Sequence, residues 1–268
     1  SSDLPMVLVQ PWRMPLLFAV SGFASYALLR KSPAILGFVR SRSKRLLLPL
    51  LFGTLFIVAP QWWIKLINEQ GYSGSLATFW WSEWLSFDDR HGYVLPDTGH
   101  LWFIAYLWTY TLALALLVWL ARGEVKRHLA ALAAWLGEEN RLLWAPLLPL
   151  LLVRVVLLFT LPEVHGVLHD WVSDATFLPP FLFGFAITAN PGWWPSLQRA
   201  TLPAALMAAV SGLIVLIIEI IWPDGVVPRG HVVQALERDA ALMMAWSMVL
   251  LLFALANRWL NRDHRWRA

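Results

Sequence analysis

Apolar residues along the chain form long continuous runs rather than alternating ones. Each run approaches or reaches the roughly 20 helical residues that cross about 30 Å of hydrocarbon. The seven runs are Met14–Leu29, Leu46–Ile67, Leu101–Ala121, Leu142–Leu161, Ala175–Ala189, Ala200–Trp222 and Ala240–Leu260. Continuous runs exclude a transmembrane β-barrel, whose strands alternate. The pattern predicts an all-α bundle of about seven transmembrane helices in one domain, residues 1–268. Pro179-Pro180 should kink or split the fifth helix.

The polar segments between these runs alternate in charge. Residues 30–45 contain six Lys or Arg, whereas residues 68–100 contain five Asp or Glu and a single Arg. Because basic loops face the cytoplasm, residue 1 should be extracytoplasmic and residue 268 cytoplasmic. We expect a multi-pass membrane protein. Residues 124–139 should form a short helix on its cytoplasmic surface.

The composition agrees with a membrane protein. The chain is 59% apolar and 14% charged, against about 45–50% and 25% in soluble domains, so soluble enzyme classes are excluded. Its 18 Trp suit the edges of a bilayer. The net charge of +4 is explained by the loop pattern, so we expect no nucleic-acid partner. The chain has no Cys, which excludes disulfides and thiolate catalysis.

The densest cationic feature is the run Arg40, Arg42, Lys44 and Arg45 before the second apolar segment. Arg42 and Arg45 are three residues apart and would project from one face of a helix. One interpretation is topology determination with attraction to anionic lipid, worth about 1 kcal/mol per residue. The other is a clamp for the phosphates of a cytosolic donor, since the Arg fork matches phosphate.

Charged and imidazole side chains in or near the spans are the other candidates for chemistry. Arg154 and Glu219 stand inside apolar runs, where charges are costly and often functional. They would either pair structurally or contact substrate. His100 opens the third span as a general base or a hydrogen-bonding anchor. His165 and His169 have metal-ligand spacing on a helix, but no third ligand is indicated, so we expect no metal site.

Residues 79–87 contain four aromatic side chains besides Phe87. They would lie in the membrane interface as an amphipathic helix or stack on sugar rings. No Gly-rich phosphate loop, nucleophile elbow or zinc-protease motif occurs in the sequence.

Several motifs in residues 11–105 together resemble the acyltransferase type 3 membrane family, in the order found there. They are Trp12-Arg13-Met14-Pro15, Ser21-Gly22-Phe23, the basic run from Phe38 to Gly53, Pro60-Gln61, and Gly99-His100-Leu101-Trp102-Phe103. The sequences of these motifs are most similar to those of the branch of the glucan biosynthesis protein C, which resembles a succinyltransferase of periplasmic glucans.

The resemblance implies about ten spans with both ends cytoplasmic, so we expect this chain to be truncated at both ends. It implies that Arg42 and Arg45, with Arg40 and Lys44, hold acyl-CoA as donor substrate, with no tightly bound cofactor. It makes Arg13 and Gln61 candidate substrate contacts. The family's presumed catalytic His lies in a first span that nothing upstream of Trp12 supplies. His100 is therefore a catalytic candidate only as a motif member.

The sequence thus predicts a membrane-embedded O-acyltransferase. It would move an acyl group from cytoplasmic acyl-CoA to a hydroxyl of an extracytoplasmic glycan, with a His base activating the hydroxyl. One alternative is a glycan or lipid exporter, although only the Pro179-Pro180 span is broken and no second half mirrors it. The other is a non-catalytic subunit that assembles with a glycan synthase.

Overall fold

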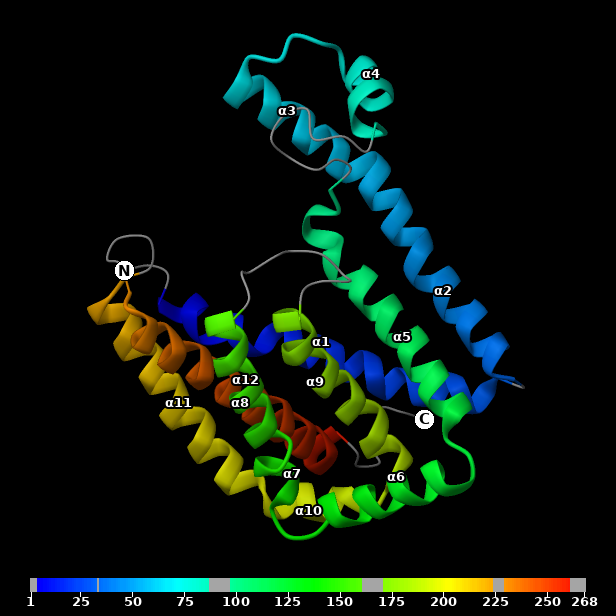
Figure 1. Cartoon of the computed structure of the whole chain (residues 1–268), viewed down its shortest axis with the longest axis vertical. Coiled ribbons are helices and arrows are strands. Elements are labelled where there is room, and N and C mark those ends of the chain that lie inside the picture. The colour runs from blue at the N-terminus through cyan, green and yellow to red at the C-terminus, as the bar shows by residue number, and fades with distance from the viewer. Residues whose placement is uncertain (1–3, 33, 87–96, 161–170, 224–228, 261–268) are drawn as a thin grey trace. The chain divides into compact units, whose positions relative to one another are not determined.

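The computed structural model describes residues 4–32, 34–86, 97–160, 171–223 and 229–260, without the side chains of 4, 154–160 and 171–172. The described residues form helices and no strand, which confirms the predicted all-α class (Figure 1). Contacts divide the chain into two compact units. Unit 1 comprises Ser1–Lys31 and Leu117–Ala268, and unit 2 comprises Ser32–Leu116.

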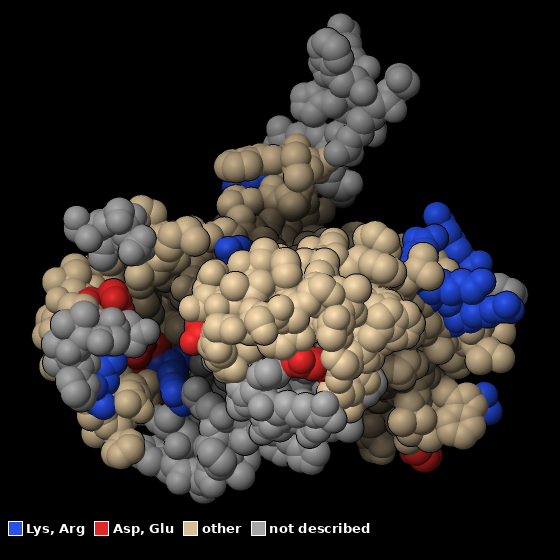
Figure 2. All heavy atoms as spheres, turned by 90° about the horizontal axis from the view of Figure 1, so that it is seen from above, with Lys and Arg blue, Asp and Glu red and all other residues tan. Residues whose placement is uncertain are grey.

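Five helices in the described ranges are long and apolar enough to cross a membrane, and they match the first, second, third, sixth and seventh predicted spans. They are Pro5–Lys31, Ile35–Gln70, Gly99–Leu120, Thr201–Ile221 and His231–Leu260. On the face shown in Figure 2, charged side chains are sparse and uncharged residues form most of the surface. Such a surface suits helices that face lipid.

The fourth and fifth predicted spans differ from the expectation. The fourth is covered by two shorter helices, α7 (Arg141–Trp144) and α8 (Leu147–Thr160). The fifth is one continuous helix, α9 (Trp171–Ala189), with both prolines inside it, so of the two predicted effects, a kink or a split, the split does not occur. A membrane helix tolerates Pro because neighbouring groups can bond the carbonyls that the missing N–H groups leave.

Unit 1 is built around a close crossing of α1 (Leu4–Lys31) and α9, which overlap in the view of Figure 1 and are in contact. A Cβ built on Gly22 would lie 1.9 Å from the Phe181 carbonyl oxygen, and one on Gly184 would lie 1.8 Å from that of Ala19. The two backbones therefore touch at reciprocal glycines. Small residues allow this close approach between membrane helices.

Most of the remaining helices of unit 1 pack on α12 (His231–Leu260), which pairs with α11 (Thr201–Ile221) (Figure 1). The buried indole Nε1 of Trp246 donates to the carbonyl oxygens of Leu142 and Leu143, at 3.2 and 3.1 Å. The predicted helix at 124–139 is observed as α6 (Gly123–Leu136). Trp193 in α10 (Trp193–Arg199) donates to the Ala133 carbonyl oxygen at 2.7 Å and so holds α6.

Unit 2 contains one long helical run and the segments that pack on it. The run comprises α2 (Ile35–Phe52), the π-helix η1 (Gly53–Val58) and α3 (Ala59–Gln70). After it come α4 (Leu76–Phe79), the π-helix η2 (Trp80–Trp84), the 3-10 turn η3 (Gly99–Leu101) and α5 (Trp102–Leu120). The basic run, which precedes the predicted second span, lies inside α2, in agreement with the expected helical spacing of Arg42 and Arg45. Lys and Arg are good helix formers.

Candidate functional site

Four cations occupy little more than one turn of α2. Arg40, Lys44 and Arg45 are exposed, and Arg42 is half-buried. Arg45 acts electrostatically on Arg42, as expected for guanidinium groups one helical turn apart. Two like charges on one face raise the local positive potential, which an anion would relieve. The geometry therefore suits a ligand with several phosphate oxygens.

Helix α5 runs beside α2 and connects the basic run to the segment of His100. Near the basic run, the Trp108 Nε1 donates a hydrogen bond of 2.9 Å to Ser43 Oγ. Further along the same helical run, Leu101 lies against Gly53 of η1, where an added Cβ would meet the Leu101 side chain. At 1.5 Å rise per residue, Ser43 and Gly53 are about 15 Å apart along the helix. The two parts of the candidate site are thus separated by about 15 Å of helix.

His100 is exposed on the turn η3. The turn is fixed by Asp97, whose Oδ1 accepts the Gly99 N–H at 3.1 Å, and by the Leu101 N–H, which donates to the Thr98 carbonyl oxygen at 2.9 Å. Gly99 has a φ of 51°, a conformation that side chains other than Gly rarely adopt. The flanking motif residues therefore have structural roles, and they leave the imidazole at the surface.

The other candidate residues are distributed over both units. Gln61 is exposed in α3, close in sequence to η1, so it shares unit 2 with His100. Arg13 is exposed on α1 in unit 1. The side chain of Arg154 and the whole of His165 and His169 lie outside the described residues. Among the residues described, no group of three His, Asp or Glu could hold a metal ion.

The aromatic segment, which begins at Phe79, folds back on α3. There it forms a buried cluster in unit 2, which we call the aromatic cap. Its members are Val58, Ala59, Leu66, Phe79 and Trp84. Phe79 and Trp84 are fully buried, whereas Trp81 is 70% exposed. The segment is helical through α4 and η2, and Phe87 lies outside the described residues. Because the cap buries Phe79 and Trp84, those rings are not available to stack on a sugar.

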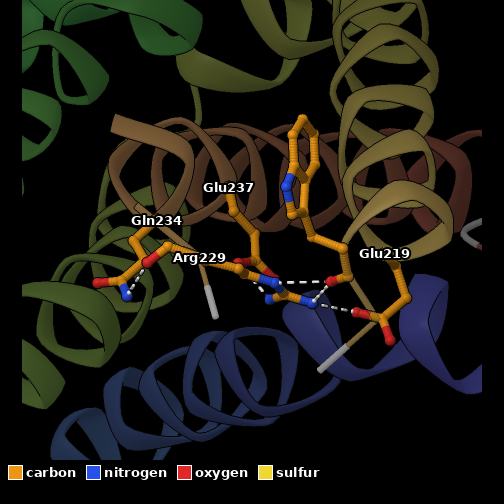
Figure 3. Close-up of polar contacts among 5 residues, drawn as sticks. Glu219, Arg229, Gln234 and Glu237 are labelled. Carbon is orange, nitrogen blue, oxygen red and sulfur yellow. Dashed lines mark hydrogen bonds and ion pairs between the residues drawn. The ribbon is translucent and has the colours of Figure 1, made fainter. Parts of the chain in front are cut away.

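A second polar cluster in unit 1 surrounds Arg229, between the end of α11 and the start of α12 (Figure 3). The guanidinium donates to Glu219 and to Glu237, each at 2.6 Å, and to the Trp222 carbonyl oxygen through Nε at 2.9 Å and Nη2 at 2.7 Å. The Arg229 side chain is 9% exposed. Burial alone would lower the pKa of Arg229. The hydrogen bonds to Glu219 and Glu237 together raise it by more than burial lowers it, so the pKa of Arg229 is raised overall.

Sequence reasoning found Glu219 but missed Arg229 as its partner. It searched for charges within apolar runs, and Arg229 lies in the connection between two runs. The available signal was a cation placed between Pro228 and Gly230, with carboxylates on the helices at both sides. Charges at such a connection can reach the ends of both helices.

Comparison with protein-family models gives a match over nearly the whole chain. Residues 2–267 match the sequence model of the type 3 family described as "Acyltransferase domain". No curated protein and no solved structure matches the chain.

Proposed function

The chain belongs to the type 3 family of acyltransferase domains and is a membrane acyltransferase, and from this premise we propose its donor and acceptor. The donor is acyl-CoA, bound from the cytoplasm at Arg40, Arg42, Lys44 and Arg45. The acceptor is a hydroxyl group of an extracytoplasmic glycan. The motifs in residues 11–105 favour a periplasmic glucan and a bacterial inner membrane, where a glycan synthase would be a partner.

The observation that carries this proposal is the concentration of four cations within six residues of α2. Coenzyme A carries several phosphate oxygens, and Arg binds them with two parallel N–H donors. Attraction to anionic lipid would need positive charge at the surface but no shared helix face. The half-buried Arg42 beside Arg45 is better suited to one bound polyanion.

The proposed reaction is attack of the acceptor hydroxyl on the thioester carbonyl carbon. A C–O bond forms, the C–S bond breaks, and coenzyme A leaves as a thiol after taking up a proton. A general base removes the hydroxyl proton as attack proceeds. His100 is a candidate for this base because it is exposed on a fixed turn. The roughly 15 Å from the basic run to this turn suits an extended donor held by its phosphates.

The donor site is tested with the double variant Arg42→Ala/Arg45→Ala, in the full chain in lipid nanodiscs. Loss of two charge-assisted contacts should weaken acyl-CoA binding by about tenfold or more, measured by titration calorimetry. The matched control is Lys126→Ala/Arg127→Ala. It removes the same charge from exposed positions of α6 and should bind acyl-CoA normally.

Unchanged acyl-CoA affinity in the Arg42→Ala/Arg45→Ala protein would overturn the donor site. Equal weakening in both variants would also overturn it, since binding would then depend on net charge alone. Counterflow of labelled glycan in proteoliposomes without donor would instead indicate an exporter.

A further inference from the structure

A proline follows the π-helix of unit 2, which lies beside the turn of His100. The π-helix η1 joins α2 to α3. In a π-helix each N–H bonds the carbonyl five residues earlier. The residue five positions after Leu55 is Pro60, which has no N–H to donate. The Leu55 carbonyl therefore cannot accept the bond that a π-helix would give it.

A side chain from another segment supplies a donor instead. The Trp80 Nε1 donates to the Leu55 carbonyl oxygen at 2.8 Å. The Trp80 ring also packs against Phe56, with centroids 5.9 Å apart and planes inclined by 31°. An unpaired carbonyl in apolar surroundings is costly. Trp80 thus stabilises the π-helical form at the place where Pro60 interrupts the bonding.

The same π-helix supports the turn that carries His100. Its first residue, Gly53, lies against the Leu101 side chain. Its last residue, Val58, lies against Gly99, where a Cβ would be 3.1 Å from the Val58 Cγ1. Both neighbours of His100 are therefore seated on η1. A change in the winding of η1 would displace Gly99 and Leu101 and would therefore move the imidazole of His100.

We propose that Trp80 is a positioning residue for the acyl-transfer site: its indole N–H fixes η1 at Leu55, and η1 fixes the turn of His100. This inference rests on the proposed function in taking the turn as part of the reaction site. The aromatic segment then acts as an internal brace of unit 2. Trp80 itself contacts neither substrate nor the reacting atoms in this scheme.

The test removes the N–H and keeps an aromatic ring, with Trp80→Phe in the full chain in nanodiscs. The matched control is Trp63→Phe. Trp63 donates from its indole to the Gly74 carbonyl oxygen at 3.0 Å, so the control loses the same kind of bond at a carbonyl away from Pro60. The readouts are amide hydrogen exchange in peptides covering residues 55–60 and 98–102, and steady-state acyl transfer.

Trp80→Phe should speed exchange in both peptides. It should lower kcat by about threefold to tenfold, with an unchanged KM for acyl-CoA, and Trp63→Phe should change neither. Unchanged exchange in both peptides would overturn the brace. Faster exchange in 55–60 alone would overturn the positioning of the turn.

Hydrogen exchange does not require turnover, so the brace is tested even if the native protein fails to transfer acyl groups. That failure would count against the proposed function alone. Conversely, an active enzyme in which Trp80→Phe loosens both peptides at unaltered kcat would show that the turn of His100 lies outside the reaction site.

Discussion

Arg229 links the ends of two membrane helices through charge. It contacts Glu219 of α11 and Glu237 of α12, and both carboxylates are only about a quarter exposed, at 23 and 25%. Removal of one partner from such a cluster leaves charge that water screens poorly, which makes the loss larger than the original gain. The cluster is therefore expected to matter more for stability than an exposed ion pair.

We predict that Arg229→Met lowers the free energy of unfolding by about 3 kcal/mol, because two carboxylates lose their cation. The measurement is thermal unfolding in detergent, followed by Trp fluorescence. In Glu219→Gln/Arg229→Met/Glu237→Gln, where no charge is left, most of the stability should return. If Arg229→Met alone were as stable as the native protein, the cluster would not hold the helix ends together.

The pH dependence of this cluster follows from the raised pKa of Arg229, in which the carboxylate hydrogen bonds outweigh the lowering by burial. A cation with a raised folded-state pKa stabilises fully below its unfolded pKa, and the contribution is lost only as pH rises through the folded value. For Arg that lies above ordinary alkaline conditions. Arg229 should therefore stay charged across neutral and moderately alkaline pH.

At this scale the sequence indicated which charges were unusual but not how they pair. Glu219 stood out because it lies in an apolar run. Its contact with Arg229 depends on the path of the chain between Ile221 and His231, which local patterning does not determine. His100 is a similar case, because its exposure follows from the contacts of Gly99 and Leu101 with η1.

Among the described helices, α1 and α9 cross with their backbones in direct contact at Gly22 and Gly184. We predict that Gly22→Ala or Gly184→Ala destabilises the protein by about 1–3 kcal/mol or more, because each new methyl group meets a carbonyl oxygen of the facing helix. Thermal unfolding of the purified variants measures this loss.

Gly192→Ala is the matched control for these substitutions, because no atom lies within 4 Å of its added Cβ. It should unfold at the native temperature. Native stability of both Gly22→Ala and Gly184→Ala would mean that the helices lie further apart than the structure has them.

Hydropathy predicted the positions of the long apolar helices well, and their ends and irregularities poorly. The predicted span Ala200–Trp222 differs from α11 (Thr201–Ile221) by one residue at each end. The second span was predicted to start at Leu46, eleven residues after the start of α2 at Ile35. The cationic residues before Leu46 are helical, but because they are polar, hydropathy does not count them as part of the span. The π-helix at Gly53 depends on Pro60 and Trp80 together, and a tertiary contact of this kind has no hydropathy signature.

For the whole molecule, the orientation in the membrane is open to a direct test. The chain has no Cys, so single introduced thiols report sidedness without background. We predict that an impermeant maleimide labels Ser73→Cys in intact spheroplasts, and labels Ala130→Cys only after permeabilisation, because basic loops stay cytoplasmic. Both positions are exposed. The opposite labelling pattern would invert the topology and move the proposed donor site to the outside.

The packing of α1 has a consequence for how the chain is made. Its main partners, α9, α11 and α12, all follow it late in the sequence, and about 140 residues separate Lys31 from Trp171. At about 5–20 residues per second, synthesis of that stretch lasts roughly 7–28 s. During this interval α1, with Arg13 on its surface, lies in the bilayer without its native neighbours. The insertion machinery or lipid must therefore cover its contact surface until α9 is made. Slower translation would lengthen the time for which this surface is uncovered.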